Sequence, residues 1–292
     1  MVKLSFRIRT FLLYFVVFWF TIHLVFTTIT GISGWDPFGD LPGKKGVVAL
    51  FAFTAAYGIV AASAIVFGDK GTRIQCEIMS EFENRGYTDR FLTLCDQEIK
   101  RLIATNSVYS RYRPFSQYVL LRCDGLLNYG RVYEAAKCID LININDILTH
   151  LKGAYSVVTI QGYFNNQMDI SAEPGDVNRA NAVLEAAKPY IKTYRDSGAI
   201  GRLMEYELYA LYYLAIGDYQ KGLLNAQAMI AYSKSANAKF SGNYQACRIC
   251  LRAGDYSSAK AYLAEAEANA KRPSWKNAVD YMKKCMQQVT QN

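Results

Sequence analysis

The chain has 292 residues, of which 51% are hydrophobic and 20% are charged, and its formal net charge is +8. This composition excludes a disordered chain, because disordered sequences contain few apolar residues and carry a high density of charge. The length allows one or two domains, and the apolar residues are concentrated near the N-terminus.

Two long uncharged runs occupy the N-terminal part of the chain. The first extends from Thr10 to Trp35, and the second extends from Gly46 to Gly68. A helix needs about 20 mostly apolar residues to cross the hydrocarbon core of a membrane, so both runs are long enough. The segment between them is rich in glycine, proline and aspartate, which favour turns. We therefore predict a transmembrane hairpin over residues 1–72, with spans at about 10–32 and 46–68.

Basic residues flank the predicted hairpin on both sides. Lys3, Arg7 and Arg9 precede the first span, and Lys70 and Arg73 follow the second. Short basic flanks stay in the cytoplasm. We therefore expect an integral protein of a plasma or inner membrane, with the N-terminus and the C-terminal domain both cytoplasmic. A cleaved signal peptide is the alternative, but its apolar region would be only about 7–15 residues long.

Small residues recur four positions apart in the second run, at Ala52 and Ala56 and then at Gly58 and Ala62. This spacing lets helices approach closely. It favours either packing within the hairpin or self-association into a homo-oligomer through the second span. His23 lies in the first run, and no acidic or basic partner for a proton relay occurs in either run. We interpret His23 as a neutral imidazole packed between helices.

The remaining sequence, residues 73–292, contains internal repeats. The clearest copies are LYYLAIGDYQKGLLNAQAM, which begins at Leu211, and CRICLRAGDYSSAKAYLAEA, which begins at Cys247. Each combines two helical stretches around a Gly-Asp-Tyr turn. Weaker copies surround Gly86, Gly130 and Gly175, so that turn glycines recur at intervals of 37 to 45 residues.

These copies resemble the tetratricopeptide repeat. Ala210 and Cys247 stand at the small-residue position of the family's first helix, and Gly222 and Ala259 stand at that of its second helix. The resemblance implies an all-α solenoid, in which stacked helix pairs bury a shared core. We expect about five helix pairs in residues 73–292, followed by a capping helix that begins near Trp275.

The repeat intervals leave the class of solenoid open. Tetratricopeptide repeats have a period of about 34 residues, so each copy here carries extra residues. Heat or armadillo repeats, with periods of about 40 to 47 residues, are the alternative. We expect the segment from Gln161 to Pro174 to be a loop that accommodates some of the extra residues.

The sequence predicts no catalytic, cofactor or metal site. It contains no glycine-rich phosphate loop and no metalloprotease or hydrolase signature. Cys247 and Cys250 form a C-x-x-C pair, but both occupy packing positions of a predicted helix, so we expect them to be structural. We therefore expect neither an enzyme nor a bound cofactor. The positive charge is modest and dispersed, so we expect no nucleic-acid partner.

The resemblance also implies a ligand groove lined by the first helices of the repeats. The residues that correspond to the groove positions are Glu207, Leu211, Leu214, Tyr244, Arg248 and Arg252. Arg248 and Arg252 share a helix face, so with Tyr244 they could hold a peptide carboxylate or an acidic motif. The expected function is a membrane-anchored scaffold or adaptor that binds a protein or peptide. A regulatory subunit of a membrane channel, transporter or translocation complex is the alternative.

Overall fold

A computed structural model describes residues 70–105, 108–111, 113–150, 154–195, 199–232 and 235–291. They belong to the second of the two units into which the chain divides, Asp69–Asn292. The predicted membrane spans and His23 lie outside the described residues. Within the described ranges, no helix has both the length and the apolar character that crossing a membrane requires.

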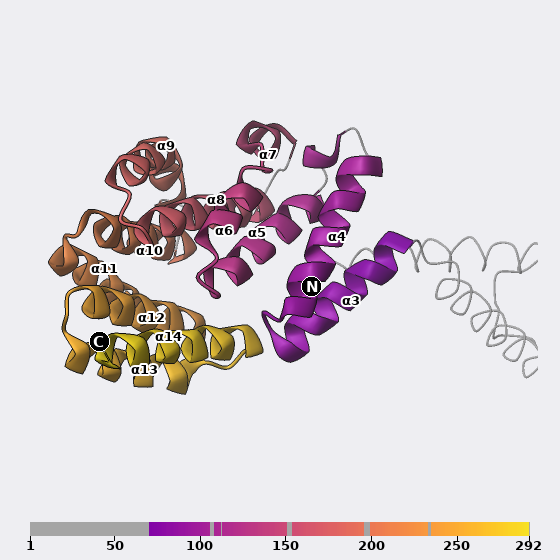
Figure 1. The fold of residues 1–292 in the computed structure, drawn as a ribbon. Coiled ribbons are helices and arrows are strands. Elements are labelled where there is room, and N and C mark those ends of the chain that lie inside the picture. The colour runs from indigo at the N-terminus through magenta and orange to yellow at the C-terminus, as the bar shows by residue number, and fades with distance from the viewer. Residues whose placement is uncertain are drawn as a thin grey trace, which may run out of the picture. The chain divides into compact units, whose positions relative to one another are not determined.

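The described residues form helices and no strand, which confirms the predicted all-α class for this part of the chain (Figure 1). In chain order the elements are α3 (Lys70–Arg85), α4 (Asp89–Thr105), the short 3-10 helix η1 (Tyr109–Arg111), α5 (Arg113–Leu127), α6 (Val132–Ile139), α7 (Ile144–His150), α8 (Ala154–Ala172), α9 (Val177–Arg195), α10 (Ala199–Ile216), α11 (Tyr219–Tyr232), α12 (Ala236–Arg252), α13 (Tyr256–Asn269) and α14 (Pro273–Gln291).

Consecutive helices pack as pairs, which gives a solenoid-like arrangement. The pairs are α3 with α4, α5 with α6, α8 with α9, α10 with α11 and α12 with α13, and α14 follows the last pair. The short elements η1 and α7 lie between pairs and contain some of the extra residues. The loop expected from Gln161 to Pro174 is wrong, because α8 continues through most of this segment to Ala172.

Each pair turns at one of the glycines identified in the sequence. Gly86, Gly130, Gly175, Gly217 and Gly254 have φ angles between 67° and 79°, and no other residue type has a positive φ in the described ranges. Glycine adopts this left-handed conformation without the steric penalty that a Cβ brings. Around Gly254, the backbone N–H of Asp255 donates to Cys250 and that of Gly254 donates to Leu251. These bonds satisfy the last carbonyls of α12.

The residue after the turn glycine starts the next helix in three of the five pairs. Asp176, Asp218 and Asp255 each accept a hydrogen bond from the backbone N–H three residues later, at 3.0, 3.2 and 3.0 Å. Aspartate is favoured at this position because its carboxylate satisfies an unpaired N–H at the helix N-terminus. Glycine followed by aspartate therefore ends one helix and begins another, which explains the recurrent Gly-Asp pair.

Small residues let the second helix of each pair approach the first. Ala135, Ala180 and Ala259 are fully buried, as the repeat pattern predicts for this position. At Gly222, a Cβ would lie 3.2 Å from Cδ1 of Ile249, so even alanine would be tightly packed there. The helix pairs thus bury a continuous apolar core, with a second cluster beneath α14.

The last helix returns to the first pair. Helix α14 packs against α3, and the side chain of Asn277 accepts a hydrogen bond from the backbone N–H of Tyr87 at 2.8 Å. A Cβ at Gly86 would lie 2.5 Å from the backbone nitrogen of Ser274, so the two segments are in close contact. In Figure 1, α14 lies beside the α3–α4 turn. The first and last helices of the solenoid therefore contact each other around a shared interior.

Candidate functional site

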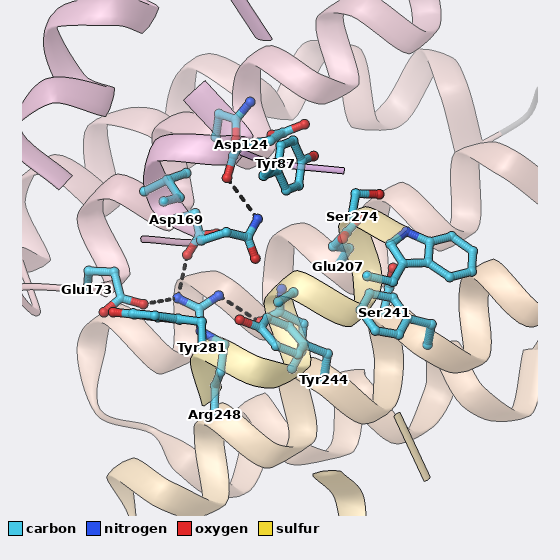
Figure 2. A pocket seen from close by; sticks show the side chains of 17 residues that line it. Tyr87, Asp124, Asp169, Glu173, Glu207, Ser241, Tyr244, Arg248, Ser274 and Tyr281 are labelled. Carbon is cyan, nitrogen blue, oxygen red and sulfur yellow. Dashed lines mark hydrogen bonds and ion pairs between the residues drawn. The ribbon is translucent and has the colours of Figure 1, made fainter. Parts of the chain in front are cut away.

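A cavity of about 210 Å³ occupies this interior (Figure 2). Its walls come from α5, α8, α10, α12 and α14, which we call the inner helices, and from Tyr87 in the α3–α4 turn. A neighbouring cavity of about 270 Å³ lies between α5, α8, α10 and α12. The two cavities share five lining residues, namely Asp124, Asn166, Asp169, Glu207 and Gln245.

The cavity wall carries four carboxylates, which come from three different helices or directly follow one of them. Asp124 comes from α5, Asp169 comes from α8, Glu173 follows the end of α8, and Glu207 comes from α10. Asp124 and Asp169 each stand six residues before the turn glycine of their pair, as does Arg248 on α12. Equivalent positions of stacked repeats lie on the same face of the solenoid. This register brings side chains that are far apart in the sequence to one wall.

Arg248 is the buried cation of the cavity, and its side chain is only 7% exposed. Its Nη2 atom binds Asp169 and Glu173, and its Nη1 atom donates to Oε1 of Gln245 at 3.0 Å. Figure 2 shows the guanidinium between the carboxylates of Asp169 and Glu173. Arg252 reaches Glu173 from a more exposed position and donates to its backbone carbonyl. A buried arginine needs such partners, because an unpaired charge is costly to bury.

Asp124 lies apart from Arg248 in a polar, half-buried corner of the cavity. Burial raises the pKa of its carboxyl to about 6, and the negative charge of Asp169 acts in the same direction. Hydrogen bonds from Asn166 and from the hydroxyl of Tyr87 oppose this increase in the pKa. The carboxyl therefore exchanges its proton close to neutral pH.

Glu207 is the second carboxyl with a strongly raised pKa. Burial raises its pKa to about 7, and the charges of Asp169 and Asp124 contribute to the increase. Nδ2 of Asn165 donates to Oε2 of Glu207 at 2.8 Å, which lowers the pKa but does not restore its ordinary value. Near neutral pH, this part of the cavity holds protons that an incoming cation could displace.

Aromatic side chains cover the side of the cavity near α12 and α14. The rings of Phe240 and Trp275 are stacked, with centroids 4.8 Å apart, and Phe240 also stacks on Tyr244 at 5.7 Å. Tyr87 and Tyr281 complete the aromatic lining. Aromatic faces attract cations and also pack against aliphatic chains. The cavity therefore combines carboxylates with rings that lie next to them, as in the hydrogen bond between Tyr87 and Asp124.

The structure brings four of the six predicted groove residues to the two cavities. Glu207, Tyr244 and Arg248 line the first cavity, and Leu211 lines the second. Leu214 is instead buried in the core, with 5% of its surface exposed.

The remaining groove residue, Arg252, does not line either cavity. Its side chain is 46% exposed, and it bonds to Glu173 from outside. Leu214 and Arg252 therefore line neither cavity.

The predicted role of Arg248 as a carboxylate ligand remains a prediction. The guanidinium of Arg248 is bound to Asp169 and Glu173, so a ligand carboxylate would compete with these two partners. The sequence interpretation missed Asp124, Asp169 and Glu173, whose negative charges determine the character of the cavity. The repeat register contained the signal for two of them, because both stand at the same distance from their turn glycine as Arg248.

The C-x-x-C pair lies inside the helical core. Cys247 and Cys250 are free thiols with at most 3% of their surface exposed. Burial raises the pKa of Cys247 to about 12, so its thiol stays protonated and is a poor nucleophile or metal ligand. In the described part of the chain, no group of three or more histidine, cysteine or acidic side chains could hold a metal ion.

Comparisons of the chain with protein-family models, with curated proteins and with solved structures give no match.

Proposed function

We propose that this chain is a membrane-anchored adaptor whose helical unit binds a protein or peptide at the cavity. The observation that carries the proposal is the composition of the cavity wall, to which five inner helices and the α3–α4 turn contribute. A surface made from many repeats can contact one ligand segment at several points. The glycine turns and buried small residues also support the assignment of a tetratricopeptide-like unit.

The membrane part of the proposal is supported by the sequence. The uncharged runs at about 10–32 and 46–68 are long enough to span, and their basic flanks favour a cytoplasmic helical unit. Attachment to a membrane raises the effective concentration of a partner near that surface. Moderate affinity at the cavity would therefore be sufficient for the function.

Site-specific photocrosslinking in living cells tests the proposal. A benzophenone amino acid replaces Ser241, which lines the cavity on α12, in the full-length chain. The matched position is Glu265, which is exposed on α13 and lies outside both cavities. We expect a discrete crosslinked protein from position 241 and none of the same mass from position 265.

A second variant shows whether the crosslink reports binding. Tyr244→Ala removes an aromatic side chain of the cavity wall and leaves the carboxylates in place. It should reduce the crosslink from position 241 while the amount of folded protein stays the same. Equal crosslinking from positions 241 and 265, or a crosslink unaffected by Tyr244→Ala, would contradict the adaptor proposal.

A further inference from the structure

The charges that face the cavity do not balance. Four carboxylates line it, whereas Arg248 is the cation among its lining residues. Arg248 is shared between Asp169 and Glu173, and Arg252 also reaches Glu173. Asp124 and Glu207 are bound by neutral donors, which are the side chains of Tyr87, Asn165, Asn166 and Gln161. Among the described residues, the side of the cavity between α5 and α10 therefore has acceptors for a cation but no cation.

Two buried polar side chains at the cavity have unused hydrogen-bonding capacity. Gln245 is 6% exposed and lines both cavities, and its Oε1 atom accepts from Arg248. Within the described residues, its amide nitrogen donates to no protein acceptor. The hydroxyl of Ser274, a residue that is 3% exposed, likewise has no protein partner in the described ranges. Neither atom is among the fully buried unpaired atoms of the described residues, so both donors are open to the cavity, where a ligand that supplies an acceptor oxygen can reach them.

The size of the cavity restricts the ligand. Sites for drug-sized molecules and cofactors have volumes of about 300–1,000 Å³. This cavity of about 210 Å³ and its neighbour of about 270 Å³ are each below this range, so each by itself suits a side chain better than a complete cofactor. The rings in the lining of the first cavity, among them Tyr244, Trp275 and Tyr281, suit the aliphatic stem of a long side chain and attract a cationic head.

Together these features point to the class of ligand. We infer that the cavity binds the cationic side chain of a lysine or arginine in a peptide segment, whose charged head lies between Asp124 and Glu207. In this arrangement, Gln245 and Ser274 donate to carbonyl oxygens of the same segment. The inference rests on the proposed adaptor function and specifies which partner chemistry the adaptor recognises.

The inference also gives a direction for the effect of pH. A bound cation favours ionised Asp124 and Glu207, whose pKa values are raised to about 6 and about 7 in the free protein. Binding therefore releases protons, and affinity should increase as the pH rises from 5.5 to 8. The other titratable groups that face this region are Tyr87, Asp169, Glu173, Tyr244, Arg248 and Tyr281.

Calorimetric titration of the full-length protein with short peptides tests the inference. The probes are acetylated and amidated Gly-Arg-Gly and Gly-Lys-Gly, together with Gly-citrulline-Gly, in which a neutral urea replaces the guanidinium. We expect at least one cationic peptide to bind about tenfold or more tightly than the citrulline peptide, because charge-assisted hydrogen bonds are stronger than neutral ones. The preference for the cationic peptide over the citrulline peptide should be smaller at pH 5.5 than at pH 8.

Matched variants locate the effect. Glu207→Gln and Asp124→Asn should each reduce the preference for the cationic peptide by at least about fivefold. Glu265→Gln, at an exposed position outside the cavities, should leave it unchanged. Equal loss in the Glu265→Gln protein would overturn the inference, because the effect would then be one of general charge.

The outcomes separate this inference from the adaptor proposal. If the citrulline peptide binds as well as the cationic peptides while position 241 still crosslinks a partner, the charge inference is overturned and the adaptor proposal stands. If methylguanidinium or butylamine binds as tightly as the peptides and position 241 crosslinks nothing, the cavity is a site for free cations. That result would overturn both proposals.

Discussion

Arg248 is the residue on which the ion pairs of the cavity depend. Its side chain is 7% exposed, and its partners Asp169 and Glu173 are 21% and 30% exposed. Arg248→Met would leave both carboxylates without their shared cation. We expect a loss of about 3–5 kcal/mol in the free energy of unfolding, as is typical when one member of a buried pair is removed. Urea denaturation of the full-length protein, followed by circular dichroism, measures the loss.

Arg252 supplies the control for this prediction. It binds the same Glu173 but is 46% exposed, so Arg252→Met should cost at most about 1 kcal/mol. Adding Asp169→Asn to the Arg248→Met protein should recover part of the lost stability, since one of the uncompensated charges is removed. Equal destabilisation by the two arginine variants would show that burial of Arg248 does not determine its contribution.

Glu207 should make the stability of the helical unit depend on pH. The pKa of its carboxyl is raised from 4.5 to about 7, so between these values the unfolded chain loses a proton that the folded chain keeps. The contribution of Glu207 to stability therefore falls as the pH rises through this range and stays constant above it. Glu207→Gln removes this decrease. We therefore expect the stability of the variant, relative to that of the parent protein, to be higher at pH 8 than at pH 4.

Thermal unfolding at pH 4, 6 and 8 provides the measurement. The difference in stability between Glu207→Gln and the parent protein should shift in favour of the variant between pH 4 and 8. Asp124 remains in both proteins, and its raised pKa causes part of the decrease in each. A difference that is independent of pH would contradict the assigned environment of Glu207.

The sequence contained part of the information about these residues. Asp124, Asp169 and Arg248 share one register with respect to their turn glycines, so their common face could be predicted. The pairing of Arg248 with α8 could not be predicted from this register. Helix α10 lies between α8 and α12 in the chain, and Leu211 occupies the same register position on it. Which carboxylate meets which cation depends on the curvature of the solenoid, and repeat spacing does not specify that curvature.

At the scale of the elements, the turn glycines should differ in their importance. Gly217 has a φ of 79°, and a Cβ there would meet no atom within 4 Å. Gly217→Ala should therefore cost only the backbone strain, about 1–2 kcal/mol. Gly86 has a similar φ, but a Cβ there would lie 2.2 Å from Oδ1 of Asn277. Gly86→Ala should cost more, because α14 must also move away.

Chemical denaturation of the two alanine variants compares these costs. The double variant of Gly86→Ala with Asn277→Ala removes the nearest clashing atom as well as the hydrogen bond to Tyr87. The cost of Gly86→Ala should be smaller in that background than in the parent protein. Equal costs for Gly86→Ala and Gly217→Ala would mean that α14 does not constrain the first turn.

The elements differ in how well the sequence predicts them. A glycine followed by aspartate has a local reason to end one helix and start another, so these turns could be located without tertiary information. Helix α8 cannot be predicted from local sequence in the same way, because Gly162, Asn165 and Asn166 have low helix propensity. Contacts with α5 and α10, together with the bond from Asn165 to Glu207, stabilise it as a helix. Tertiary packing outweighs the local preference there.

At the scale of the whole helical unit, the contact between its first and last helices can be tested by hydrogen exchange. The backbone N–H of Tyr87 donates to the side chain of Asn277 across 190 residues of sequence. Asn277→Ala should increase the exchange rate of the Tyr87 amide and of amides in the adjacent turn. Exchange within α9, which does not line the cavity, should remain the same.

Asn269→Ala is the matched control. In the described ranges, the side chain of Asn269 bonds within its own helix, to the carbonyl of Glu265 on α13. This substitution removes an asparagine from the same C-terminal region without affecting α3 or its turn. Faster exchange at Tyr87 in both variants would indicate general loosening and would contradict a specific contact through Asn277.

The return of α14 to the α3–α4 turn also constrains how such a chain can evolve. In an open solenoid each repeat contacts only its neighbours, so duplication or loss of a repeat changes the length but leaves the other contacts in place. Here an additional helix pair would separate Asn277 from Tyr87 and remove α14 from the wall that it shares with α5. Point substitutions on the inner helices can change the ligand, whereas a change in the number of repeats would open the cavity.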